Sequence, residues 1–346
     1  MNMISPSTVT RMTPRPHSDS TCVYIAACAS SEEAGGVYRY EFREGRLDFL
    51  DLTPMDRPMY LARENGCLYV LLRAPYGGDR EESALAVYQL LPDGRIGERL
   101  SLTPTDGIVA CHHSVVGEDV YAVNYLSGNV SLVGRKTVTH EPIPLTAAMN
   151  PKRQEMPHTH CIIPSPDSRY MLVADLGLDT VFVYDRALAP ISSARVPEGY
   201  GARHLVFSRD GGRLFCVNEL KASVTLFLFE EGHLTYVQTV SCGVDEIANP
   251  DNTAAAIRLS ADERYLYVSN RGADTVTVFD VAAFSPVASV PTGGRSPRDI
   301  ILAPDGQSII CANMNSNTAT VLSLREGIPG EVSAEVSLPA PLAVIF

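Results

Sequence analysis

Short apolar segments separated by polar turns repeat along most of the chain. In each copy, an apolar segment, a polar turn and a second apolar segment ending in a polar residue are followed by a third apolar segment. The segments are rich in Val, Ile, Tyr and Leu, and Pro, Asp and Gly occupy the turns, which is typical of β-strands. The clearest copies span residues 161–185, 204–229, 257–280 and 300–324, and weaker copies span 23–42, 67–90 and 114–133.

The spacing of these copies predicts the architecture. The residue that ends the second segment recurs every 43 to 52 residues, at positions 28, 72, 124, 175, 218, 270 and 313. A fourth strand follows most copies, as at 234–240 and 286–292, and we find no amphipathic helix of ten residues or more. Seven units of four strands predict an all-β fold, a seven-bladed β-propeller with four antiparallel strands per blade. Residues 339–346 are expected to add a closing strand.

No linker interrupts the repeat, so we expect residues 21–346 to form a single propeller domain. Residues 1–20 lack the continuous apolar stretch of a signal peptide and are expected to form a flexible N-terminal tail. No apolar run of 18 residues occurs, which predicts that the chain does not span a membrane. These features together predict a cytoplasmic protein.

The charge balance narrows the range of partners. The chain has 28 Lys and Arg against 40 Asp and Glu, a formal net charge of −12. Such a charge disfavours nucleic acids and anionic membrane surfaces as partners, but a local basic cluster could still bind a small anion. The eight cysteines form no C-x-x-C pair, and no glycine-rich nucleotide loop is present, so we expect no cofactor. The protein is expected to be a monomer or a small homo-oligomer.

Polar residues gather at two positions of the repeat. In a propeller blade the first strand lies nearest the central channel and the second runs antiparallel beside it, so the start of the first and the end of the second meet at one end of the hairpin. In blades three to seven these positions hold His112, His113 and Asn124; His158, His160 and Asp175; Arg203, His204 and Glu219; Arg258, Asn270 and Arg271; and Arg298, Asp299 and Asn313.

This convergence of cations and ionisable groups predicts an anion site at one mouth of the channel. We expect its substrate-binding residues to be His158, His204, Arg298, Asn270, Asn313 and His112. A structural alternative is that Asp and Asn at the strand ends only hold the following turns. A metal site at His158, His160 and Asp175 is a second alternative, but the neighbouring arginines would repel a dication, so no metal is expected.

Several of these segments resemble a known family. Residues 157–179, 199–220, 255–276 and 297–313, with their H-x-H…D-L-G-x-D and G-x-R-H…N-E-L motifs, resemble the seven-bladed-propeller lactonases. That family includes propeller-type 6-phosphogluconolactonase and an enzyme that interconverts carboxymuconate and its lactone. The resemblance implies that the substrate is a small anionic lactone. It also implies the catalytic set His160, Arg203, Glu219 and Arg271.

Three functions are compatible with the sequence. The favoured one is hydrolysis of a lactone that carries an anionic group, most simply as a 6-phosphogluconolactonase. His160 would then be the general base, Arg203 or Arg271 would stabilise the oxyanion, and Glu219 would orient the histidine or act as an acid. A muconate-type cycloisomerase would use the same residues for proton transfer at carbon. The third possibility is a propeller that binds a ligand or a protein without catalysis, because the fold alone does not determine function.

Overall fold

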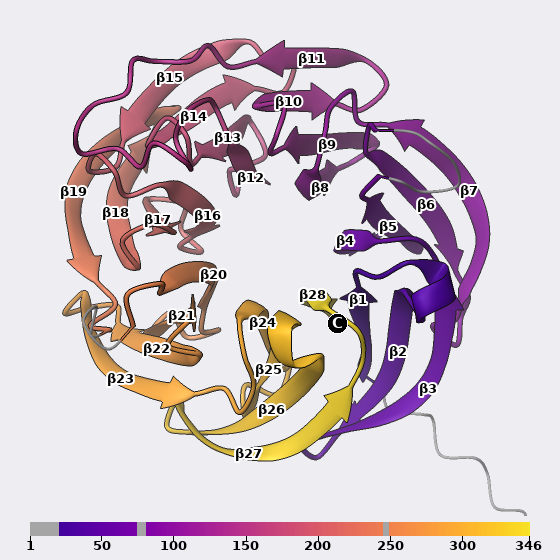
Figure 1. The fold of residues 1–346 in the computed structure, drawn as a ribbon. Helices are drawn as coiled ribbons and strands as arrows, with labels where there is room; N and C mark the ends of the chain where they lie inside the picture. The colour runs from indigo at the N-terminus through magenta and orange to yellow at the C-terminus, as the bar shows by residue number, and fades with distance from the viewer. Residues whose placement is uncertain (1–20, 75–80, 245–248) are drawn as a thin grey trace, which may run out of the picture.

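The computed structural model describes residues 21–74, 81–244 and 249–346, and the expected N-terminal tail at 1–20 lies outside this range. Seven four-stranded antiparallel sheets form a closed ring around a central channel, so the predicted seven-bladed β-propeller is confirmed (Figure 1). The described residues otherwise contain two short 3-10 segments, η1 (Ser31–Glu33) and η2 (Met314–Ser316). Among them, no helix is long and apolar enough to cross a membrane. All eight cysteines are free thiols.

The first three blades are built from these strands, innermost strand first. Blade one contains β28 (Pro341–Ile345), β1 (Thr21–Ala27), β2 (Gly36–Arg43) and β3 (Arg46–Pro54). Blade two contains β4 (Pro58–Glu64), β5 (Cys67–Leu72), β6 (Ala84–Leu90) and β7 (Ile96–Pro104). Blade three contains β8 (Ala110–Val116), β9 (Asp119–Asn124), β10 (Asn129–Leu132) and β11 (Lys136–Thr139).

The other four blades follow the same order. Blade four contains β12 (Thr159–Pro164), β13 (Tyr170–Asp175), β14 (Thr180–Asp185) and β15 (Pro190–Arg195). Blade five contains β16 (Ala202–Phe207), β17 (Arg213–Asn218), β18 (Ser223–Glu230) and β19 (His233–Ser241). Blade six contains β20 (Thr253–Leu259), β21 (Tyr265–Arg271), β22 (Thr275–Asp280) and β23 (Ser285–Pro291). Blade seven contains β24 (Pro297–Leu302), β25 (Ser308–Asn313), β26 (Thr318–Arg325) and β27 (Ile328–Ser337).

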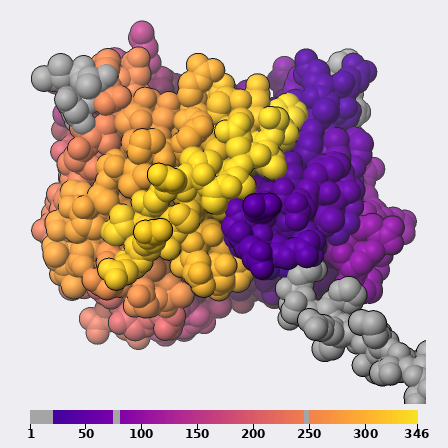
Figure 2. Space-filling model, turned by 90° about the horizontal axis from the view of Figure 1, so that it is seen from below, coloured from indigo at the N-terminus to yellow at the C-terminus, as the bar shows by residue number. Residues whose placement is uncertain are grey.

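The ring is closed by pairing the two ends of the described chain. Strand β28 pairs antiparallel with β1 and supplies the innermost strand of blade one, as the apolar 339–346 segment predicted. In the space-filling view, the C-terminal segment in yellow lies directly against the indigo N-terminal blade (Figure 2). Apolar side chains between neighbouring blades form the core, for example Phe215 and Val217 of blade five against Ile257 and Leu266 of blade six.

A β-bulge interrupts the innermost hairpin of every blade close to its start. In blade five, for example, Ala202 pairs with Asn218 and His204 with Val217, so that Arg203 has no partner in the ladder. A bulge of this kind redirects one side chain and occurs often beside functional sites. The unpaired residues are Met59, Cys111, His160, Arg203, Ala255 with Ala256, Arg298 and Leu342.

Candidate active site

The bulges build the wall of one cavity. Six of the unpaired residues, which we call the bulge ring, line the same small space in the channel: Met59, Cys111, His160, Arg203, Arg298 and Leu342. A second ring, the hairpin ring, is formed by residues that end the second strand of a blade or come directly after it: Arg73, Tyr125, Glu219, Arg271 and Met314. Above the bulge ring, all five border a cavity of about 290 Å³, together with Val109 and Arg153. The repeat therefore determines which side chains face the mouth.

Glu219 lies at the centre of the charged part of this cavity. Its buried carboxylate accepts a hydrogen bond from Arg203 Nε at 2.7 Å, lies 3.1 Å from Arg271 Nη2, and accepts a third contact from Arg153 Nη2. Its backbone is held on both sides, because Glu219 N donates to Gly201 O and its carbonyl accepts from Ala254 N. One carboxylate is therefore shared by three guanidinium groups.

The arginines determine the ionisation of Glu219. Burial opposes ionisation, but Arg271, Arg203 and Arg153 together hold the pKa of Glu219 well below its usual value. The carboxylate is therefore ionised at neutral pH and cannot donate a proton to a leaving group. Among the described residues it makes no hydrogen bond to His160. Its observed contacts orient the arginines, in contrast to the expected role as a histidine partner or acid.

Arg203 and Arg298 differ in how they are held. Arg203 is fixed by Glu219 and by a 2.6 Å hydrogen bond from Nη1 to Ala255 O. Burial and the nearby Arg271 lower the pKa of Arg203 to about 10, so it remains charged at neutral pH. Arg298 faces the same cavity but makes no hydrogen bond or ion pair with another residue in the described part of the chain. Its five donors are therefore available to a ligand.

His160 lies on β12, where the bulge turns its ring into the channel between the two cavities. Burial and the Arg203 charge lower its pKa well below 6.5, so the imidazole is neutral and able to accept a proton at physiological pH. Its ring lies edge-on to Tyr125, with centroids 5.6 Å apart. Within the described ranges, its ring nitrogens make no hydrogen bond to another residue.

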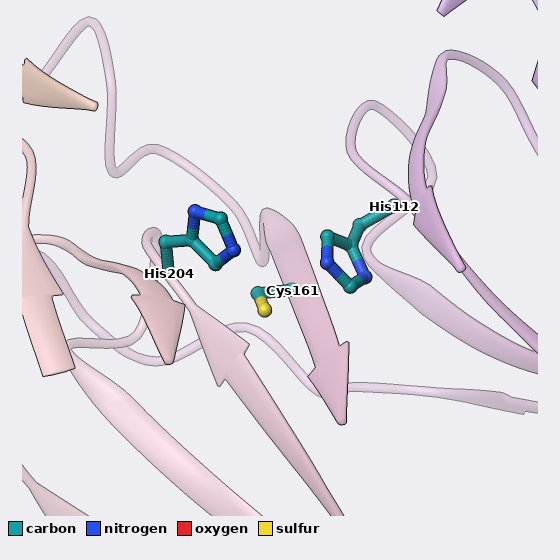
Figure 3. Close-up of side chains that lie close together, drawn as sticks. All are labelled: His112, Cys161 and His204. Carbon is teal, nitrogen blue, oxygen red and sulfur yellow. The ribbon is translucent and has the colours of Figure 1, made fainter. Parts of the chain in front are cut away.

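A deeper layer of the channel follows one residue along the innermost strands. This deep ring contains Tyr60, His112, Cys161, His204 and Asp299. The ligating atoms of His112, Cys161 and His204 come within 4.8 Å of one another, the one such group of His, Cys, Asp or Glu side chains among the described residues (Figure 3).

The surroundings of this group disfavour a dication. Arg258 Nη1 lies 3.4 Å from His204 Nε2 and donates from Nη2 to Asp299 Oδ1 at 2.6 Å. Burial lowers the pKa values of His112 and His204 well below 6.5 and raises that of Cys161 to about 12, which leaves all three uncharged. His112 and His204 border the narrow space beneath the bulge ring, so they lie below the large cavity.

The other sequence-predicted binding residues lie outside the cavity lining. His158 Nδ1 donates to Tyr125 O at 2.9 Å, and its ring stacks on that of Tyr125 at 4.4 Å. The amide nitrogens of Asn270 and Asn313 donate to Thr277 and Thr320 of the third strands, each seven residues further on. These contacts match the structural alternative, in which Asn at the strand end holds the following turn.

The site predicted from the sequence lacks three polar residues that line the cavity: Arg73, Tyr125 and Arg153. Tyr125 follows Asn124 at the same repeat offset as Glu219 follows Asn218, so the repeat itself contained the signal. Arg153 lies on the connection between β11 and β12, outside the repeat, and no sequence pattern indicates it. Its Nη2 donates to the Tyr125 hydroxyl at 3.2 Å as well as to Glu219.

Comparison with known proteins agrees with this geometry. The family described as Lactonase, 7-bladed beta-propeller, matches residues 23–346. The chain belongs to the seven-bladed β-propeller lactonases. An uncharacterized Staphylococcus saprophyticus protein is 26% identical to this lactonase-family chain over 325 residues, which cover 88% of the chain and 92% of the relative.

Solved structures support the same family. The periplasmic gluconolactonase of Pseudomonas aeruginosa is 26% identical, with a TM-score of 0.82 over 94% of this lactonase and 98% of that chain. A candidate 6-phosphogluconolactonase of Bacteroides fragilis is 23% identical, with a TM-score of 0.84 over 96% and 99% of the two chains, and this likeness shows the fold. At the level of reaction class, the family and the Pseudomonas aeruginosa neighbour support a lactone hydrolase.

Proposed function

We propose that the chain hydrolyses a lactone bearing an anionic group, with 6-phosphogluconolactone as the favoured substrate. The observation that carries this proposal is the charge of the cavity. Among the described residues, Glu219 is the one carboxylate that lines it, whereas Arg73, Arg153, Arg271 and Arg298 all line it and Arg203 lies directly beneath. The neutral His160 belongs, like Arg203, to the bulge ring. Positive charge in excess of its counterion, beside a proton acceptor, suits an anionic ester.

In this mechanism His160 activates water. The imidazole takes a proton from the water while its oxygen attacks the lactone carbonyl, and the carbonyl oxygen becomes negatively charged. Arg203, held by Glu219 and Ala255 O, and Arg298, which has no partner among the described residues, are the donors for this oxyanion. The bond between the carbonyl carbon and the ring oxygen then breaks, and the leaving oxygen takes the proton back from His160. The product is a hydroxy acid.

Glu219 acts in this scheme through the arginines. An ionised carboxylate with three guanidinium partners fixes their planes before substrate arrives, which reduces the reorganisation needed during the reaction. The outer end of the cavity, near Arg271 and Arg153, is then the place for the anionic group of the substrate.

The test is a substrate panel with the purified wild-type chain. We expect release of acid from 6-phosphogluconolactone well above the rate of spontaneous hydrolysis, measured with a pH indicator. The same preparation is incubated with carboxymuconolactone and followed in the ultraviolet. Turnover of the second compound alone would replace hydrolysis by cycloisomerisation, and turnover of neither would favour a binding propeller.

A further inference from the structure

The connection between β11 and β12, residues 140–158, brings one side chain into the cavity from outside the repeat. It is anchored to blades four and five: Gln154 Nε2 donates to Leu176 O at 3.0 Å and to Asp179 Oδ1 at 2.8 Å, and Thr146 Oγ1 donates to Glu198 Oε1 at 2.7 Å. Arg153, next to Gln154, therefore has a backbone of fixed position.

Asp179 links this connection to the start of blade five. The same carboxylate accepts hydrogen bonds from Gly199 N at 2.7 Å and Gly201 N at 2.6 Å, two residues before Arg203. Gly201 has a φ of +72°, and a Cβ there would come within 2.8 Å of Leu220. The buried Asp179 carboxylate thus holds the backbone near both Arg153 and Arg203. The distance between the two arginines is therefore set by the backbone.

The guanidinium of Arg153 is only partly used. Its two hydrogen bonds, to Glu219 and to the Tyr125 hydroxyl, both come from Nη2. Nε and Nη1 make no hydrogen bond to another residue in the described ranges, which leaves three N–H donors. Exposure of the side chain is 37%, against 15% for Arg271 and 5% for Arg203, so of the three partners of Glu219 it is the most open to a ligand.

Among the described residues, the charge of Arg153 is also only partly compensated. Glu219 carries a single negative charge that three guanidinium groups share, so the cluster retains two positive charges. Arginine forms charge-assisted hydrogen bonds with the oxygens of a phosphate or carboxylate, and the free Nε and Nη1 groups of Arg153 can each donate to such an oxygen. The location of Arg153 on the mouth side of Glu219 leaves the deeper Arg203 for the carbonyl oxygen.

We propose that Arg153 is the specificity-determining residue of the site, which recognises a phosphate monoester at the outer end of the lactone. This inference rests on the proposed lactonase function and names the group that selects among lactones. A purely positioning role, in which Arg153 only holds Tyr125 and Glu219, is the competing explanation, and it would affect every lactone equally.

The experiment compares Arg153→Gln and Arg153→Lys with the wild-type chain on two substrates, 6-phosphogluconolactone and the uncharged gluconolactone. Arg325→Gln is the matched control, because Arg325 is an exposed arginine at the end of β26 that borders none of the cavities described above. Thermal unfolding confirms that each variant is folded. Binding of the products 6-phosphogluconate and gluconate is measured by calorimetry in parallel.

We expect Arg153→Gln to lower kcat/KM for the phosphorylated lactone by about 10- to 100-fold, mainly through KM, because a charge-assisted hydrogen bond is lost. Its kcat/KM for gluconolactone should fall far less, because that lactone has no phosphate, and Arg153→Lys should recover part of the loss on the phosphorylated lactone. Equal losses on both lactones, or no loss on either, would overturn the proposal.

The two proposals fail in different ways. If the wild-type chain hydrolyses neither lactone, the proposed function is wrong, and the calorimetric measurement decides the role of Arg153. Weaker binding of 6-phosphogluconate to Arg153→Gln, with gluconate unaffected, would then support recognition of the phosphate. Equal affinities of the two chains for 6-phosphogluconate would exclude it.

Discussion

The bulge ring and the deep ring come from adjacent residues of the same strands, yet their chemistry differs. Arg203 and Arg298 of the bulge ring lie within a cluster whose positive charge exceeds its one carboxylate. In the deep ring, Asp299 is paired with Arg258 of the neighbouring strand β20, and His112, Cys161 and His204 are uncharged. The upper cavity measures about 290 Å³ and the space beneath it about 20 Å³.

This difference shows where the molecule tolerates unfavourable electrostatics. Burying several like charges near one another is costly, and a core without function would pair or omit them. The deep ring follows that rule, whereas the bulge ring and hairpin ring do not. An excess of buried cations at one level of the channel is what we expect if, as proposed above, an anionic ligand supplies the missing negative charge.

The largest expected effect is on stability, from Glu219→Gln. Without the carboxylate, three guanidinium groups lose the one counterion that they have among the described residues, and breaking a buried ion pair in this way typically costs about 3–5 kcal/mol. Urea unfolding measures this loss. Asp93→Asn is the control, because it removes an ion pair whose partners are both exposed and should change little. Equal free energies of unfolding for the two variants would mean that the Glu219 charge does not stabilise the fold.

The next effect is on catalysis, from Arg203→Met. Loss of a fixed oxyanion donor should lower kcat for 6-phosphogluconolactone by about 100- to 1,000-fold. Cys161→Ala, in the adjacent strand position of blade four, should leave kcat within the same order as the wild-type chain. If both variants lose activity equally, the bulge ring has no catalytic role that the deep ring lacks.

A smaller effect is expected from Arg298→Gln. Because Arg298 has no partner within the described ranges, its loss should leave the free energy of unfolding nearly unchanged. The variant should bind substrate more weakly, by about 10-fold in KM or more, since a charged donor to the ligand is removed. Urea unfolding tests the expected stability, and steady-state kinetics tests the expected rise in KM. A large loss of stability would show that Arg298 has a structural role instead.

The smallest effect is on the pH profile. The pKa of His160 is lowered well below 6.5 by burial and by Arg203, so the neutral, base-competent form persists as the pH falls through 6.5. Glu219 also remains ionised in this range. We therefore expect kcat/KM to stay level from pH 8 to below pH 6.5. A decline centred at or above 6.5 would mean that another group, or a solvated histidine, is the base.

The fold could be predicted because its signal is repeated. Seven copies of one strand pattern give the blades, and an unmatched apolar segment at the end gives β28. The positions of His160, Arg203, Glu219, Arg271 and Arg298 followed from the antiparallel hairpin, since residues at its two ends must meet at the same mouth. The structure brings these five residues together around the cavity.

The remainder of the site depends on features that a repeat does not encode. In a regular strand, His158 and His160 would lie on one face, but the bulge at His160 turns only that ring into the channel. Asn270 and Asn313 fit the pattern equally well as ligands or as turn residues, and their bonds to Thr277 and Thr320 are decided by packing. Arg153 reaches the cavity through tertiary contacts of a long connection, which sequence periodicity cannot predict.

The most direct measurement is a crystal structure of the chain with 6-phosphogluconate bound. We expect the product in the upper cavity, with its carboxylate within hydrogen-bond distance of Arg203 or Arg298 and His160 beside the carboxylate carbon. Its phosphate should then lie toward Arg271 and Arg153. Binding at the opposite mouth of the channel, or with the phosphate down in the deep ring, would contradict the assignment of the bulge ring as the lactone site.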